Sequence, residues 1–345
     1  MAIDLTGGQP LTRDFVFPAQ PGPDVRDAAN FWLEEENGAF AMRIGIEGWA
    51  DHWHAHDIWL DVAFADGCVF HARESGTPPS PIDAAGNPTI LGAGPVRLQC
   101  IEPFALWRAT MDPHAVARTT ATQLIDGNLP PADAPRQQVS FDIAFRPAAP
   151  PLVSGTLTAE SRELMAGEQG SFISPRFEQL CRAEGWLAID GERIAFKGQA
   201  LRIKRQGVRK YEGFWGHCWQ SALFPSGKAF GVNTFPPRDD GAPNFNEGFV
   251  FTGDGALKPA KAVSSPWLRR FLTHGEPVPL VLETEDGERH HIDGTTFIAC
   301  RSVGPSILPP SFPLIQQAHA TYTWDGERAT GMIERSSFRA QMELD

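Results

Sequence analysis

The sequence is poor in the features that mark several large classes of protein. Its 345 residues include two tyrosines and no dense run of lysine and arginine. They also include no apolar run near the ~18 residues of a membrane-spanning helix. Thirty Lys and Arg against 42 Asp and Glu give a formal net charge of −12, which disfavours a phosphate backbone as partner. We therefore expect no nucleic-acid partner and no insertion into a membrane.

Cysteine pairs and nucleotide-binding motifs are absent as well. The five cysteines are odd in number, widely spaced and without a Cys-x-x-Cys pair, which is typical of reduced thiols. Residues 1–8 lack the basic and apolar segments of a signal peptide, so we expect a cytoplasmic protein. No phosphate-binding loop, dinucleotide fingerprint or Gly-x-Ser-x-Gly elbow occurs, so no motif supports nucleophilic chemistry at serine or cysteine.

Large aromatic rings and chain breakers, in contrast, are abundant. The chain has 10 Trp, 23 Phe, 33 Gly and 30 Pro, a composition that favours short strands over long helices. Runs of β-branched and aromatic residues recur between turn signals, and several end in Asp-Gly, the strongest local hairpin signal. One helix is predicted over Ser265–Leu272, with Ser265 as cap and Pro266 at its first position.

The spacing of these strands predicts the fold class. Strands without helical periods between them exclude a parallel α/β sheet and fit barrels or sandwiches. A proline-rich stretch at 147–176 separates two halves of similar style. We predict an all-β protein of two lipocalin-like antiparallel β-barrel or sandwich domains side by side, residues 1–170 and residues 171–345.

A histidine cluster lies at residues 51–57, Asp-His-Trp-His-Ala-His-Asp. On an extended strand His52, His54 and His56 would share one face, where two of them and a third ligand would suit zinc. Alternatively, Trp53, His54 and His56 bind a substrate, or the whole stretch is a solvated loop. The metal, pocket and structural interpretations all stay open, and we commit to no metal ligand.

The segment Arg209–Trp219 contains the second cluster, Arg-Lys-Tyr-Glu-Gly-Phe-Trp-Gly-His-Cys-Trp. In a regular strand Tyr211, Trp215, His217 and Trp219 would share one side, although a bulge at Gly213 would change this parity. Such a face suits a barrel lumen that binds an apolar molecule. The alternative is a packed aromatic core with a hydrogen-bonded histidine inside it.

A series of short motifs extends this cluster in both directions. The motifs are Phe177-Glu-Gln179, Gly185-x-Leu-x-Ile-Asp-Gly191, Gly198, Trp215-Gly216, Trp324-Asp-Gly326 and Gly331-Met-Ile-Glu334. In this order they resemble the lipocalin-like superfamily of carotenoid 1,2-hydratases (hydroxyneurosporene synthases), its uncharacterised bacterial relatives and the calycin-type Diels–Alderases. The resemblance implies two calycin barrels and a hydrophobic terpenoid, polyketide or aromatic ligand. It also implies water addition to an alkene, or cyclisation, without an organic cofactor or a metal.

From this resemblance we predict a cofactor-independent lyase or isomerase of the hydratase or cyclase type. Protonating an unactivated alkene requires a carboxyl group whose pKa is raised by burial or by a second carboxylate. We predict Glu212 as this acid, with Glu178 and Glu334 as the next candidates, and His217 as the group that positions water or takes a proton. The predicted substrate-binding residues are Tyr211, Phe214, Trp215, Trp219, Trp53, His54 and His56.

Two other functions remain alternatives. A non-catalytic carrier of a hydrophobic ligand would need the aromatic lining but no buried acid. A metal-dependent enzyme would use His52, His54 and His56. The expected partner is a hydrophobic small molecule, and a homodimer is left open.

Overall fold

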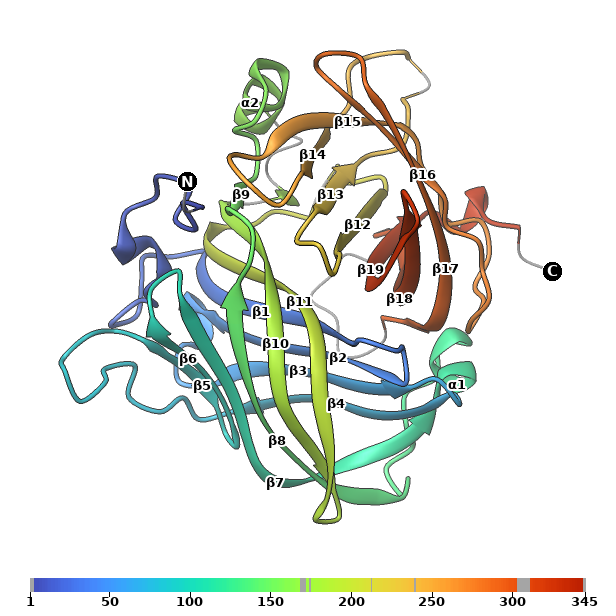
Figure 1. Cartoon of the computed structure of the whole chain (residues 1–345). Coiled ribbons are helices and arrows are strands. Elements are labelled where there is room, and N and C mark those ends of the chain that lie inside the picture. Colours follow the sequence, from blue (N-terminus) through green and yellow to red (C-terminus); the bar gives the residue numbers. More distant parts are fainter. Residues whose placement is uncertain are drawn as a thin grey trace.

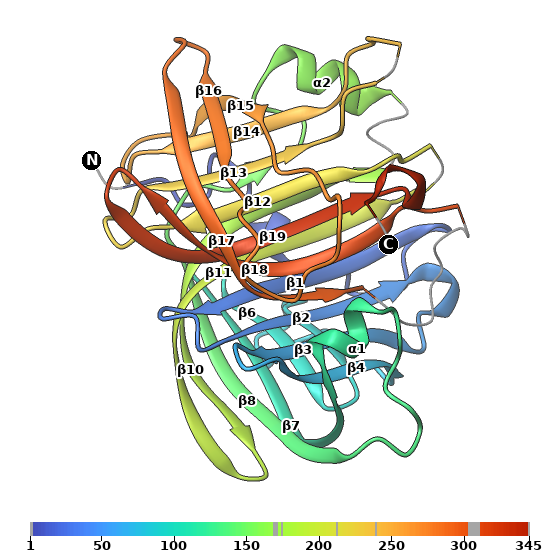
Figure 2. The ribbon, with the colours of Figure 1, turned by 90° about the vertical axis from the view of Figure 1, so that its right-hand side faces the viewer.

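The computed structural model describes residues 3–167, 172–173, 175–211, 213–238, 240–302 and 311–343. Strands dominate these residues and form a large antiparallel sheet and, beside it, a closed antiparallel barrel (Figures 1 and 2). This confirms the prediction of an all-β protein with two domains.

The first eleven strands form the large sheet, which curves around a core of its own. Its hydrogen-bonded order is β4-β3-β2-β1-β11-β10-β8-β7-β6-β5, with β9 on β10, and a further pairing joins β4 to β7. The strands are β1 (Val25–Glu35), β2 (Phe40–Trp49), β3 (His56–Phe64), β4 (Cys68–Gly76), β5 (Ile90–Ala93), β6 (Val96–Glu102), β7 (Leu106–Thr120), β8 (Arg136–Pro147), β9 (Leu152–Val153), β10 (Arg176–Ile189) and β11 (Glu192–Val208).

The closed barrel contains the remaining strands in sequence order, and pairing of the last with the first completes it. Asp325 and Gly326 both have positive φ, 48° and 79°, so the predicted Asp-Gly turn forms the last hairpin. The strands are β12 (His217–Leu223), β13 (Ala229–Thr234), β14 (Asn246–Phe251), β15 (Lys258–Ser264), β16 (Leu280–Thr284), β17 (Arg289–Arg301), β18 (Leu314–Trp324) and β19 (Glu327–Ser337).

The chain passes from the large sheet to the barrel between β11 and β12. The predicted boundary after residue 170 falls before β10, although β10 and β11 pair with strands of the large sheet. As a boundary between folding units, residue 170 stays a prediction.

Helices are few and short among the described residues. They are α1 (Ala121–Ile125), α2 (Ala159–Ala166) and the 3₁₀ turns Leu11–Asp14, Ala50–His52 and Arg339–Gln341. The helix predicted over Ser265–Leu272 is wrong: this segment is irregular, its Leu268 is buried, and Arg335 Nη1 donates a hydrogen bond to Pro266 O across 3.2 Å. Tertiary contacts thus replace the intrahelical bonds. Of the helices described, none has the length and apolarity to cross a bilayer.

Each sheet encloses its own apolar core. Phe31, Leu60 and Trp107 are among the side chains that fill the large sheet, while Phe230 and Tyr322 are among those that fill the barrel. A third cluster joins the two domains, because Trp32 and Leu201 of the large sheet pack against side chains of β12, β14 and β19. The outer face of β1 and β11 is therefore covered by the barrel.

Candidate functional site

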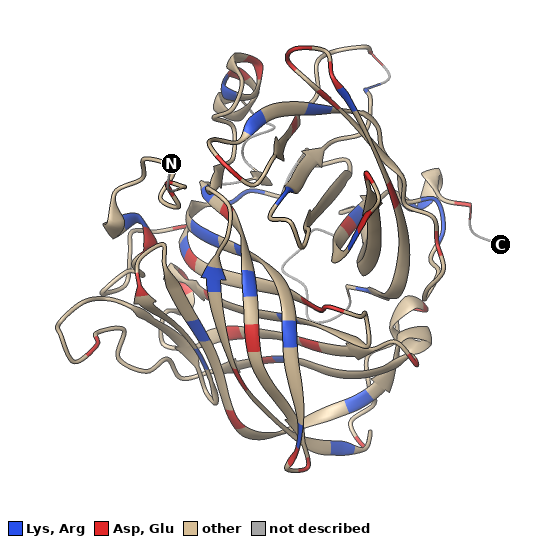
Figure 3. Cartoon of the chain, viewed as in Figure 1, with Lys and Arg blue, Asp and Glu red and all other residues tan. Residues whose placement is uncertain are grey.

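The face of the large sheet that the barrel covers carries an unusual number of polar side chains. On β1, Phe31 and Leu33 point into the core of the large sheet, whereas Trp32 and Glu34 point to the barrel, because successive side chains alternate. Charges of both signs are interspersed along the strands (Figure 3). A buried polar group requires partners, so this interface must be organised by hydrogen bonds and ion pairs.

Strand register arranges these side chains in rows that run across the sheet. The rows, from β10 through β11 and β1 to β2, are Arg176–Arg205–Ala28–Glu47, then Glu178–Ile203–Asn30–Gly45, then Leu180–Leu201–Trp32–Arg43, then Arg182–Gln199–Glu34–Ala41. The facing rows of the barrel, from β18 through β19 to β12, are His319–Met332–Ser221, then Gln317–Glu334–Trp219, with His217 opposite Ser336. The interface therefore has two ends, one at Arg205 and the other at Gln199.

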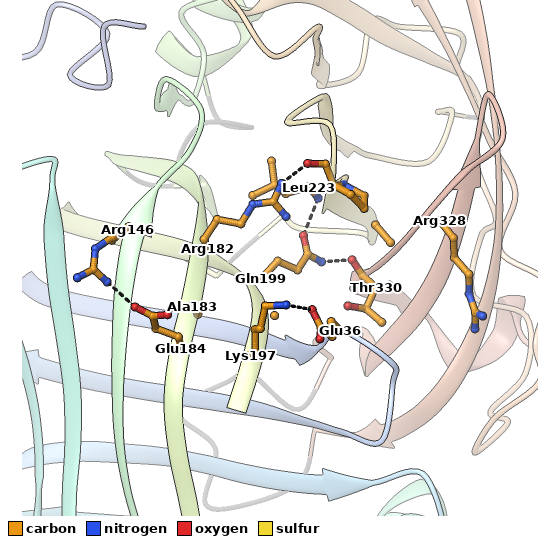
Figure 4. Close-up of a pocket in the computed structure, with 13 residues that line it drawn as sticks. Glu36, Arg146, Arg182, Ala183, Glu184, Lys197, Gln199, Leu223, Arg328 and Thr330 are labelled. Atoms are coloured by element: carbon orange, nitrogen blue, oxygen red, sulfur yellow. Dashed lines mark hydrogen bonds and ion pairs between the residues drawn. The ribbon is translucent and has the colours of Figure 1, made fainter. Parts of the chain in front are cut away.

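A cleft of about 440 Å³ opens where the Gln199 end meets the barrel (Figure 4). Arg146 and Glu184 form an ion pair of 3.1 Å on one side, and Arg328 lies on the opposite side. Gln199 lies at the junction: its Oε1 accepts from the Leu223 amide at 2.5 Å and its Nε2 donates to Thr330 O. Leu223, Ala183, Ala329 and Pro225 add apolar surface to the lining. The cleft combines an apolar floor with a charged rim.

Behind Gln199 lies a buried carboxyl group with a histidine partner. Glu34 is 1% exposed, and its Oε1 lies 2.7 Å from Nδ1 of His319, while Gln199 Nε2 donates to Oε2 across 3.3 Å. Burial raises the pKa of Glu34, and the opposing interactions with His319 and Gln199 do not cancel this effect. A raised pKa keeps a carboxyl group protonated to higher pH, which is what a general acid requires.

His319 also borders a small cavity with a mixed polar and apolar lining. The cavity, of about 10 Å³, is lined in part by Arg43, Asp61 and Gln317. This volume is about the least that holds one water molecule, and the polar side chains in the lining offer it hydrogen-bond partners. The cleft, Gln199, Glu34, His319 and this cavity thus follow one another through the interface.

His217 lies further along the same interface, within a second hydrogen-bonded group. Its Nδ1 is 2.6 Å from Ser336 Oγ and its Nε2 is 3.2 Å from Glu334 Oε1. The backbone amide of His217 also donates to Ser336 Oγ at 3.0 Å, so the amide and the ring of His217 both contact this hydroxyl. Ser336 is 1% exposed, so Ser336, His217 and Glu334 form a buried hydrogen-bonded series.

Glu334 is held in its ionised form. Burial raises its pKa, but the hydrogen bond from His217, the electrostatic interaction with His217, the charge of Arg43 and the hydrogen bond from Gln317 outweigh this and lower it to about 2. A carboxylate that is ionised at neutral pH does not donate a proton. Glu334 is therefore better suited to orienting His217 than to the predicted role of acid.

This shift predicts a specific acid sensitivity. A folded-state pKa of about 2 against an ordinary value of 4.5 means that Glu334 stabilises the fold fully above about pH 4.5. The contribution, about 3 kcal/mol, is lost as the pH falls towards 2. Urea unfolding across this pH window should show a loss of stability that is correspondingly smaller in Glu334→Gln. If Glu334→Gln lost as much stability at low pH as the parent, Glu334 would not have the lowered pKa given above.

The aromatic segment before β12 forms a packed cluster rather than one face of a strand. Residues 211 and 213–216 are not strand: Phe214 stacks on Phe172 with ring centroids 3.6 Å apart, and Trp215 Nε1 donates to Pro236 O. Tyr211 contacts Phe312. The regular-strand parity therefore holds only from His217 onward, and none of these three side chains lines the cleft. Their role in binding substrate stays a prediction.

His217 and Trp219 do share a face, but it is the outside of the barrel. Cys218 points into the barrel core, whereas Trp219 joins the interdomain cluster and lies in edge-on contact with Trp32. The expectation of a barrel lumen lined by these rings is wrong, because aliphatic and aromatic side chains such as Phe230 and Ile333 fill that lumen.

Glu178 is buried in the same interface. Its Oε2 accepts from Trp219 Nε1 at 2.9 Å and its Oε1 pairs with Arg176 at 2.6 Å. Burial, and secondarily the charge of Glu178, raise the pKa of Glu247 on β14, whose oxygens accept from the amides of Gly155 and Leu157. The role of Glu178 as an acid stays a prediction, and Glu212, the first choice, lies outside the described residues.

The histidine cluster lies apart from this interface. His52 and His54 are exposed, and His56 packs against Trp53 and bonds through Nδ1 to Gly92 O at 3.0 Å. Burial lowers the pKa of His56. No hydrogen bond, ion pair or ring contact among the described residues joins Trp53, His54 or His56 to the Tyr211–Trp219 segment. Nor does any group of three or more metal-ligating side chains converge within them.

The structure also brings forward residues that the sequence did not single out. Glu34, Gln199 and His319 come from three strands, and no local motif marks them. The one signal in the sequence was the position of Glu34: it follows Leu33 directly in a run of large apolar residues, where a carboxylate is unusual.

Comparisons with known proteins agree with the architecture. An AttH-like protein from Nitrosomonas europaea is similar at a TM-score of 0.54 and 14% identity, covering 91% of this chain and 92% of that one. CghA with Sch210972 is similar at a TM-score of 0.54 and 10% identity, covering 92% and 89%. At these identities the similarity concerns the fold alone. A search of curated protein sequences gives no match. The family model described as "Domain of unknown function (DUF7064)" matches residues 20–339, and because this is most of the chain, the protein belongs to that family.

Proposed function

We propose that this protein is a lyase or isomerase, of the hydratase or cyclase type, which protonates an alkene-containing small molecule bound in the cleft between its two domains. The observation that carries the proposal is the Glu34–His319 pair: a buried carboxyl group with a raised pKa, hydrogen-bonded to Gln199, which lines the cleft. Perturbed carboxyl groups in clefts are typical of catalytic sites.

The reaction begins when Gln199 releases Thr330 and Leu223 and exposes Glu34 to the substrate. Glu34 gives its proton to one alkene carbon, which forms a C–H bond and leaves a cation on the neighbouring carbon. In a hydratase, water then adds to the cation and loses a proton. In a cyclase, a second alkene attacks the cation, forms a C–C bond and leaves a new cation, which then loses an adjacent proton. In an isomerase, the first cation loses an adjacent proton directly. Either proton returns to Glu34 by way of His319.

These steps need a proton donor, a proton acceptor and water, so we propose no organic cofactor and no metal. The substrate is a terpenoid, polyketide or aromatic compound, in keeping with the superfamily resemblance. The solved neighbour CghA with Sch210972 supports a ligand-binding role for this fold. A cytoplasmic location is proposed with it, and a homodimer remains open.

A carrier of hydrophobic ligands is the weaker alternative. A carrier needs an apolar cavity and no buried acid, because each buried polar group costs free energy without improving retention of an apolar ligand. The charged rim of the cleft and the buried Glu34 and Glu178 favour catalysis instead.

The test is a screen in D₂O of apolar alkenes from the three compound classes, read by mass spectrometry. The parent should incorporate deuterium into one substrate class, and Glu34→Gln should not. The neighbouring Glu35→Gln serves as control, because Glu35 bonds only within its turn, to Asn37 and Ala39. Ligand bound but never deuterated, by parent and variants alike, would favour the carrier.

A further inference from the structure

Four arginines gather at the end of the interface opposite the cleft. Arg176 on β10 is the direct cross-strand partner of Arg205 on β11. Arg205 is opposite Ala28, so Arg26 lies two residues along β1 on the same face. Arg209 follows β11 directly. We call these four residues the arginine cluster.

Three of the four arginines are buried, and among the described residues two carboxylates pair with the arginine cluster. Arg26, Arg176 and Arg205 are 0%, 4% and 5% exposed. Arg26 pairs with Glu47 at 2.8 Å and Arg176 with Glu178 at 2.6 Å. In the part of the chain that the structure describes, four positive charges thus pair with two carboxylates, Glu47 and Glu178.

Within the described ranges, Arg205 is the residue without a direct partner, although the charge of Glu47 acts on it from a distance. Among the described residues its guanidinium makes no ion pair or hydrogen bond, and its buried Nε has no acceptor. Nε and Nη2 of Arg26 are likewise buried without acceptors. A guanidinium cannot relieve this by losing its proton under ordinary conditions, so the free energy of an unmet charge is retained in the fold.

The electrostatics agree with the geometry. Burial, followed by the charges of Arg26, Arg209 and Arg176, holds the pKa of Arg205 well below its usual range. Burial and the charges of Arg26 and Arg176 also lower the pKa of Arg209, to about 10. A bound anion would reverse these effects and stabilise all four guanidinium groups.

Aromatic rings surround the arginine cluster on its other sides. Trp49 lies 5.0 Å from the Arg26 guanidinium, Trp219 lies 5.0 Å from that of Arg176, and Phe172 lies 4.2 Å from that of Arg209. Rings hold the guanidinium groups in place through their faces but accept no strong hydrogen bonds. The hydrogen-bonding edges of Arg205 and Arg26 thus remain for another acceptor.

We propose that the arginine cluster is a binding site for a compact dianionic oxyanion, a phosphate group in chemical type. Two excess positive charges match a dianion, and guanidinium groups suit the oxygens of phosphate better than any other side chain. The site lies six residues along β11 from Gln199, about 20 Å, so it is separate from the cleft and does not depend on the proposed reaction.

The probe is inorganic phosphate, measured by calorimetric titration and by thermal unfolding against sodium chloride and sodium acetate at equal ionic strength. Phosphate should bind to the parent and raise its Tm, while the monoanions should not. Arg205→Gln should weaken phosphate binding at least about tenfold. The same variant should raise the Tm in chloride, because it removes an unpaired buried charge.

Three outcomes would overturn the proposal. The first is that Arg205→Gln has a lower Tm in chloride or does not fold, which would show that Arg205 has a structural partner. The second is that this variant binds phosphate as tightly as the parent. The third is that acetate stabilises the parent as much as phosphate does. Arg205→Lys keeps the positive charge but lacks the planar set of hydrogen-bond donors of a guanidinium. It should fold like the parent and bind phosphate more weakly. The exposed Arg108→Gln removes an arginine paired with Asp142 and should respond to phosphate like the parent.

Discussion

Glu34→Gln should lower kcat by about 10²–10⁴-fold with little change in KM. Glutamine keeps the shape of the side chain and a hydrogen bond to His319, so binding in the cleft is preserved while the transferable proton is lost. The measurement is steady-state turnover of the substrate that the deuterium screen identifies. Parallel rises in KM with unchanged kcat would mean that Glu34 only supports binding.

The pH profile gives an independent check of the same residue. Because burial raises the pKa of Glu34, its protonated form persists to higher pH than that of an exposed glutamate. The parent's kcat should therefore be steady at low pH and fall as the pH rises through this pKa. The residual activity of Glu34→Gln should lack that descending limb, whereas Glu35→Gln should retain it. A parent profile without the limb would exclude Glu34 as the acid.

The strands could be predicted because their determinants are local. Asp190 and Gly191 adopt φ of 50° and 86°, the positive values that an Asp-Gly hairpin turn requires, and β10 and β11 follow on either side. The strand β15 was missed because Lys258 and Pro259 make its sequence resemble a loop. In a closed barrel its neighbours fix it regardless of propensity.

The start of β1 was missed for a different reason. Arg26, Asp27 and Asn30 resemble a solvated leader, and the run of large apolar residues that indicates a strand begins only at Phe31. In the structure, the strand separates these charges to opposite faces: Arg26 pairs with Glu47 towards the barrel, and Asp27 pairs with Lys204 on the other side. Burial of these polar side chains depends on partners far along the chain, which composition does not reveal.

The same limit applies to the candidate site. Glu34 and His319 are 285 residues apart, and they meet only because β1 pairs with β11 and the barrel covers both. Period-two alternation predicted that His217 and Trp219 share a face. It did not indicate which face, because Cys218 and Trp219 are equally compatible with a core.

Asp14, in the segment before β1, binds side chains of the large sheet through its carboxylate. We expect loss of this carboxylate to have the largest effect on the stability of the fold. Asp14 is fully buried; its Oδ1 binds Arg202 Nη1 at 2.5 Å and its Oδ2 accepts from Trp107 Nε1 at 2.9 Å and from the Phe104 amide at 2.7 Å. Asp14→Ala leaves the Arg202 guanidinium buried among aromatic rings with only Gln179 as acceptor.

We expect Asp14→Ala to lower the free energy of unfolding by about 3–5 kcal/mol, because an isolated buried charge costs more than a buried pair contributes. Urea unfolding of the parent and the variant measures the loss. Removing both charges, in Asp14→Ala combined with Arg202→Met, should restore much of it, since an apolar pair of similar volume packs in the same core. Asp4→Ala is the control, because the Asp4 carboxylate bonds only to Thr6 and Gly8 on the surface. A double variant as unstable as Asp14→Ala alone would show that the cost arises from the lost Trp107 and Phe104 bonds and not from the stranded guanidinium.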